Sequence, residues 1–202
     1  MGELGNGLGE IDLDEEELAI AEALVAAEKR FGTSHFDMLS ARCNLAVCYS
    51  KLGRHEEALA LRRDVLAQSV QFRCAGDLIC LHAHNLACSL LQLARYSEAK
   101  SFLLDQVPIA RHALGAEHDL TLRLRCAYGR SLSEGDGVSR DELVEATTLL
   151  GELVRTTTRI YGKVNPLTVA FQRRLLHAQT KLRLLDVEAK LAAARRRSTS
   201  KR

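Results

Sequence analysis

The chain of 202 residues repeats one pattern along most of its length. The Asn-Leu-Ala motif at residues 44–46 returns at Asn85, 41 residues later, and a matching segment places Ala127 a further 42 residues along. In a fourth copy Arg174 follows Ala127 by 47 residues, and the five additional residues fall in the polar stretch 134–141. A regular interval of roughly 20–50 residues is typical of repeat proteins, in which each unit buries its apolar face only against its neighbours.

Each copy of the pattern predicts two helices. Leu45, Tyr49 and Leu52 lie at helical spacing, Gly53 then permits a turn, and acidic residues beginning at Glu56 suit the first turn of a second helix. The chain has only 13 Gly and 2 Pro, and its 5 Phe, 4 Tyr and absence of Trp favour helices over a sheet core. We expect helices at residues 12–30, 36–51, 55–73, 78–93, 96–114, 119–133, 140–160 and 167–185, the last able to continue toward 195. The first of these has only the second-helix pattern, so the array begins with half a repeat.

Charge is distributed unevenly along the chain. Residues 1–30 carry nine acids and two bases, a balance of −7, whereas residues 181–202 carry eight bases and two acids, a balance of +6. We therefore expect three parts: a flexible leader at 1–11, a helical repeat domain at 12–185 with a half repeat and three to four helix pairs, and a basic tail at 186–202. Solvated chain ends account for this polarity, although a charged end can also serve contacts with a partner.

The residues of the repeat resemble a known family. The first copy combines His35-x-Asp37-x-Leu39, the Asn-Leu-Ala motif and Gly53-Arg54-x-x-Glu57-Ala58. This combination resembles the tetratricopeptide repeats of kinesin light chain and its relatives, in which the repeat is longer than the ordinary 34 residues. The resemblance covers roughly residues 12–185 and implies an all-α, right-handed α-solenoid of antiparallel helix pairs. It also implies that the first helix of each pair lines an inner wall along which protein partners bind.

The wall that this resemblance implies is neutral in its first half and basic in its second. The wall positions are Ser40, Cys43, Asn44, Val47 and Lys51, then Leu81, His84, Asn85, Cys88 and Gln92, then Arg123, Cys126, Arg130 and Glu134, and finally Ala170, Arg173, Arg174, His177 and Lys181. Rows of arginine are suited to binding carboxylates of an extended peptide through paired hydrogen bonds. The candidate partner-binding residues are Asn44, Lys51, His84, Asn85, Arg123, Arg130, Arg173, Arg174 and Lys181.

The sequence thus predicts a non-catalytic scaffold or adaptor that binds a protein or peptide partner, with an acidic peptide as the favoured ligand. One alternative is that the arginines only form a solvated surface and bind no partner. Another is nucleic-acid binding through the basic tail, where residues 194–202 carry five cations. Aromatic residues that could stack on bases are lacking near these cations, which argues against single-strand recognition and makes nucleic acid the less favoured partner. The sequence does not specify the identity of the partner or the oligomeric state.

No catalytic or cofactor-binding motif is present, so we expect no enzyme activity, no cofactor and no membrane segment. Six cysteines without a signal peptide indicate a reducing, cytoplasmic location. Cys80, His84 and Cys88 lie on one helical stripe, but they would span about 12 Å, too far for one zinc ion. We therefore expect no metal site, and a zinc-binding protein is the weakest alternative.

Overall fold

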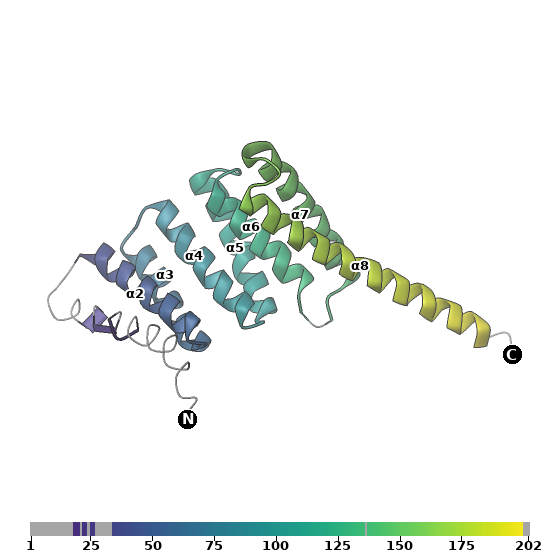
Figure 1. Ribbon diagram of the computed structural model, residues 1–202, viewed down its shortest axis with the longest axis horizontal. Coiled ribbons are helices and arrows are strands. Elements are labelled where there is room, and N and C mark those ends of the chain that lie inside the picture. The colour runs from purple at the N-terminus through teal and green to yellow at the C-terminus, as the bar shows by residue number, and fades with distance from the viewer. Residues whose placement is uncertain (1–17, 21, 24, 27–33, 136, 200–202) are drawn as a thin grey trace, which may run out of the picture. The chain divides into compact units, whose positions relative to one another are not determined.

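The computed structural model describes residues 18–20, 22–23, 25–26, 34–135 and 137–199, with side chains as far as Arg195 (Figure 1). The helices with defined bounds are α2 (His35–Lys51), α3 (His55–Gln71), α4 (Gly76–Gln92), α5 (Tyr96–Leu114), α6 (Asp119–Ser133), α7 (Arg140–Tyr161) and α8 (Pro166–Thr199). The described part of the chain contains no strand. The predicted all-α fold of tetratricopeptide-like helix pairs is confirmed.

Six of the eight predicted helices match observed helices to within about two residues at each end. The first, at 12–30, lies largely outside the described residues, although the described positions between 18 and 26 are helical. The eighth continues past 185, as the sequence allows, and ends at Thr199, a few residues beyond the expected limit near 195. Residues 182–199 contain no Gly or Pro and are rich in Leu, Ala, Lys and Arg, so nothing in the sequence ends the helix there.

The predicted division of the chain at residues 11 and 185 stays a prediction. The leader at 1–11 is not among the described residues, and the proposed boundary before the basic tail falls in the middle of α8. The backbone of residues 186–199 is helical and continuous with the repeat domain. By its internal contacts the chain separates into two compact units, residues 1–93 and 94–202.

In the first unit, α3 packs against both α2 and α4. Ala46, Ala58 and Ala87 are completely or almost completely inaccessible to solvent, which allows the helix backbones to approach closely. The turn between α2 and α3 contains Gly53 with φ of +75°, in the left-handed region that glycine adopts readily. Gly53 therefore has the role in the turn that the sequence predicts.

In the second unit, α6 packs against α5 and α7, and α8 packs against both α7 and α6. Leu122, Leu150, Leu153, Phe171 and Ala178 form the core of this packing and are buried. The contact between α6 and α8 joins the first helices of successive repeats. Side chains that both helices direct away from the core can therefore line one surface.

Two glycines in this unit allow a test of how closely α6 and α7 approach. A Cβ atom added at Gly129 of α6 would lie 3.0 Å from Cγ of the fully buried Leu150, whereas one at Gly151 of α7 would meet only Arg155 Nη1 at 3.6 Å. We expect Gly151→Ala to raise the free energy of unfolding by about 0.5–1 kcal/mol, because alanine favours helix. In Gly129→Ala, overpacking should cancel that gain. The free energy of unfolding of this variant should therefore be about 1–3 kcal/mol lower than that of Gly151→Ala. Urea denaturation measures both, and equal stabilisation by the two variants would contradict the close approach.

Candidate functional site

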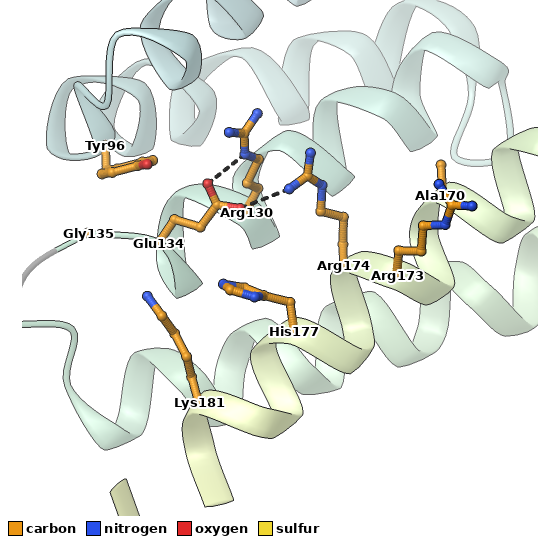
Figure 2. A pocket seen from close by; sticks show the side chains of 9 residues that line it. All are labelled: Tyr96, Arg130, Glu134, Gly135, Ala170, Arg173, Arg174, His177 and Lys181. Carbon is orange, nitrogen blue, oxygen red and sulfur yellow. Dashed lines mark hydrogen bonds and ion pairs between the residues drawn. The ribbon is translucent and has the colours of Figure 1, made fainter. Parts of the chain in front are cut away.

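A cleft of about 720 Å³ lies in the second unit between α6 and α8 (Figure 2). Tyr96, at the start of α5, and Gly135, in the α6–α7 loop, border it as well. The residues that line the cleft are Tyr96, Arg130, Glu134, Gly135, Ala170, Arg173, Arg174, His177 and Lys181. Helical spacing explains this composition, because α8 places Arg173, His177 and Lys181 on one side at intervals of one turn. Arg130 and Glu134 are likewise one turn apart at the end of α6.

Glu134 is the acidic residue of the cleft, and it binds two arginines from different helices. Arg130 Nε donates to one carboxylate oxygen of Glu134 at 2.8 Å, and Arg174 Nη1 donates to the other at 2.9 Å. The Glu134 side chain is only 13% exposed, compared with 25% for Arg130 and 43% for Arg174. Both guanidinium groups are therefore held in place by one partly buried carboxylate, which strengthens the two hydrogen bonds relative to surface pairs.

The remaining basic groups of the cleft differ in their contacts. Lys181 Nζ donates a hydrogen bond of 2.9 Å to the carbonyl oxygen of Ser133, at the last turn of α6. A cation at that position also interacts favourably with the negative end of the helix dipole. Arg173 and His177 are exposed and have no hydrogen-bond or ion-pair partner among the described residues. The lining of the cleft contains four basic side chains, Arg130, Arg173, Arg174 and Lys181, and one carboxylate, so the cleft carries a net positive charge.

The loop beside the cleft is anchored where α7 begins. The Ser139 hydroxyl accepts from the Glu142 amide at 3.2 Å, and the Glu142 carboxylate accepts from the Ser139 amide at 2.9 Å, which together form a capping box. Lys100 Nζ of α5 donates to the same carboxylate at 2.7 Å. Hydrogen bonds from Lys100 and then from Ser139 lower the pKa of Glu142 to about 2. The segment 134–139, which contains the insertion seen in the sequence, is thereby fixed at its far end.

Four of the nine predicted partner-binding residues come together in the cleft: Arg130, Arg173, Arg174 and Lys181. Arg123 lies outside it, on the first half of α6, and its Nε donates to Asp119 at 2.7 Å. The sequence analysis also placed Glu134, Ala170 and His177 on the wall, and they line the cleft too. It did not include Tyr96 or Gly135, because these belong to the start of a second helix and to a loop. The sequence did contain a signal for the Arg130–Glu134 ion pair, because the two residues are four positions apart, a spacing that favours ion pairs on a helix.

The other four predicted residues lie in the first unit. Asn44 and Lys51 of α2 are exposed, whereas His84 and Asn85 of α4 are partly buried. His84 Nε2 lies 3.6 Å from Sγ of Cys88, one turn farther along α4. Their role in partner binding stays a prediction.

All six cysteines lie among the described residues, and none of them forms a disulfide bond. On the stripe considered for zinc, Cys80 is buried and Cys88 is exposed, so the two thiols differ in their access to solvent. Across the described residues, no three His, Cys, Asp or Glu side chains are grouped so that they could hold one metal ion.

Comparisons with known proteins identify the kind of repeat. Residues 38–67 and 81–119 match the tetratricopeptide repeat family model, and these segments cover α2–α3 and α4–α5. A search of curated proteins found no match. No helix among those described is both long and apolar enough to cross a membrane.

Solved structures of kinesin light chain-like repeats share the fold. The nearly identical TPR-like repeats of a kinesin light chain-type protein from Podospora anserina match with a TM-score of 0.68 and 22% identity over 94% of this chain and 89% of that one. A single-substitution variant of these repeats matches with a TM-score of 0.67 and 22% identity over 92% of this chain and 90% of that one. BtubC (BKLC) from P. vanneervenii matches with a TM-score of 0.64 and 16% identity over 84% of this chain and 72% of that one.

The fold is thus that of a helical-repeat protein. Residues 38–67 and 81–119 are tetratricopeptide repeats, as the sequence predicts, and the fold of the chain is similar to that of kinesin light chain-like repeats. The segments that match the family model include Tyr96 but none of the basic residues of the cleft. The function of the cleft must therefore be inferred from its own geometry.

The capping box predicts a pH-dependent contribution to stability. Because the pKa of Glu142 is lowered from its ordinary value of 4.5 to about 2, its ionised form stabilises the fold above about pH 5. This contribution should disappear as the pH falls toward about 2, where the carboxyl becomes protonated in the folded state as well. Glu142→Gln should therefore melt below the parent protein at pH 7, and the difference in Tm should shrink as the pH is lowered from about 5 to about 2. A difference that stays constant over this range would contradict the assignment.

Proposed function

We propose that this protein is a non-catalytic, cytoplasmic protein–protein interaction module, and that its basic cleft binds an extended acidic peptide. The observation that carries the proposal is the gathering of Arg130, Arg173, Arg174 and Lys181 around one cleft that contains a single carboxylate. Repeat proteins commonly bind partners on the surface formed by equivalent helices of successive repeats, and α6 and α8 are such helices.

The spacing of donors on α8 supports an extended ligand. Arg173, His177 and Lys181 follow one another at intervals of four residues, which corresponds to about 6 Å along a helix. Alternate side chains of an extended peptide lie about 6.6 Å apart on one face. An extended peptide with acidic side chains at alternate positions can therefore place each of them near a different donor of this row.

The contacts available in the cleft are sufficient for moderate affinity. A hydrogen bond to a charged group contributes about 1.5–3 kcal/mol when it is well desolvated, and a micromolar complex requires about 8 kcal/mol. Two or three such bonds together with apolar contact on the Tyr96 ring approach this value. Arg173 is well placed to contribute, because among the described residues it has no competing partner.

A charge reversal at Arg173 tests the proposal. The probe is a fluorescein-labelled synthetic peptide in which Glu and Ala alternate, and its affinity is measured by fluorescence anisotropy. Arg173→Glu should weaken binding by at least about tenfold, since it removes one donor and adds a repulsive charge. Circular dichroism should show unchanged helical content, because the side chain is exposed.

The matched control is Arg183→Glu, which makes the same change at an exposed position of α8 outside the cleft. It should alter the affinity for the peptide by less than about twofold. Equal losses in the two variants would mean that only the net charge of the protein matters, and the cleft would not be the binding site.

Nucleic acid is the alternative partner, and truncation distinguishes it. Removal of residues 196–202 should leave peptide binding unchanged. If the protein instead bound a short DNA duplex with a steep dependence on salt, and lost that binding on truncation, the basic end of the chain would be the functional surface.

A further inference from the structure

The cleft already contains an anion of the kind that its proposed ligand would supply. Glu134 lies between Arg130 and Arg174, and each of its carboxylate oxygens accepts a hydrogen bond from one of them (Figure 2). The two arginines come from different helices, α6 and α8, and no other described residue places a carboxylate in the cleft. An acidic side chain of a ligand would compete with Glu134 for the same donors.

We propose that Glu134 is an internal competitor of the acidic ligand. In the free protein its carboxylate occupies the site between Arg130 and Arg174, and an acidic side chain of the peptide takes that place on binding. This inference rests on the proposed function of the cleft and adds the residue that sets its affinity and selectivity. A peptide with a single acidic residue gains little by exchanging one carboxylate for another, whereas a peptide with several also reaches Arg173 and Lys181.

The position of Glu134 in the chain permits this exchange. Glu134 follows the last residue of α6 and has an extended backbone, with φ of −108° and ψ of 144°. The glycines at 135 and 137 both have positive φ, at +124° and +71°, so the segment after Glu134 has backbone conformations that other residues rarely adopt. The capping box at Ser139 holds the far end of this segment. Because Glu134 lies outside both helices, its side chain can rotate out of the site without unwinding either α6 or α7.

The charge balance argues that Glu134 opposes binding. Arg130, Arg174 and Glu134 together carry one positive charge, and neutralising Glu134 would raise this to two. The opposite role is that Glu134 favours binding, by orienting the arginines so that their remaining N–H groups face the ligand. The two roles predict opposite changes in affinity when the charge of Glu134 is removed, so one substitution separates them.

The test uses Glu134→Gln and the labelled peptide of alternating Glu and Ala. Glutamine keeps the size and shape of the side chain but removes its charge. We expect the affinity to rise by at least about fivefold. An unchanged or lower affinity would overturn the proposal, and a clear decrease would assign Glu134 to positioning the arginines.

The control is Glu152→Gln, because Glu152 pairs with Arg125 of α6 at 3.2 Å but does not line the cleft. This variant changes the net charge of the protein by the same amount and should change the affinity by less than about twofold. If both variants bound more tightly to the same extent, general electrostatic attraction would explain the result and the internal competitor would be rejected.

Thermal melting gives a second readout of the exchange. Without peptide, Glu134→Gln should melt below the parent protein, because two arginines lose their carboxylate. With saturating peptide the difference in Tm should shrink or change sign, since the ligand then supplies the missing carboxylate. A difference that is the same with and without peptide would contradict the exchange.

Two further results keep the inference separate from the proposed function. If Arg173→Glu abolishes peptide binding while Glu134→Gln leaves it unchanged, the cleft is the site and the competitor role is wrong. If neither the parent protein nor Glu134→Gln binds the peptide, the proposed function itself fails. Should Glu134→Gln lose helical content, Glu134→Ala replaces it, because it also removes the carboxylate and should likewise bind the peptide more tightly.

Discussion

The close approach of neighbouring helices is the constraint on which the rest of this structure depends. Small residues recur wherever two helices meet, and Ala46, Ala58, Ala99, Ala146 and Ala178 are all fully buried. In the second unit this packing brings α6 and α8 into direct contact. The long polar side chains that point away from the core therefore share one surface. The cleft is thus a product of the packing as much as of the residues that line it.

Much of the fold could be predicted because its signals are local and periodic. The spacing of Leu45, Tyr49 and Leu52, the turn at Gly53 and the interval between copies determine where helices begin and end. Equivalence between copies then placed Arg130 and Arg174 on the same wall, and the structure brings both to the same cleft. The exact end of α8 could not be predicted, because no residue near it marks a helix terminus that a pattern could detect.

The arrangement inside the cleft could not be obtained in the same way. The Arg130–Glu134 pair lies within four residues and is visible in the sequence, whereas Arg174 reaches Glu134 across 40 positions of the chain. That second contact depends on the rotation of α8 against α6, which is determined by the buried face of α8 and by the insertion before α7. Tyr96 enters the cleft from a third helix for the same reason. The sequence therefore predicted a row of cations but not the carboxylate that links two of them.

The continuity of α8 determines how the two basic regions of the second unit are connected. Lys181 borders the cleft and Arg195 lies near the far end of the same helix, about 21 Å away at the ordinary rise of a helix. A flexible tail would sample many distances and would adapt to partners of different size. A helix instead holds the regions at Lys181 and Arg195 at one fixed separation. A molecule that contacts both regions must match this separation, and it gains avidity only when it does.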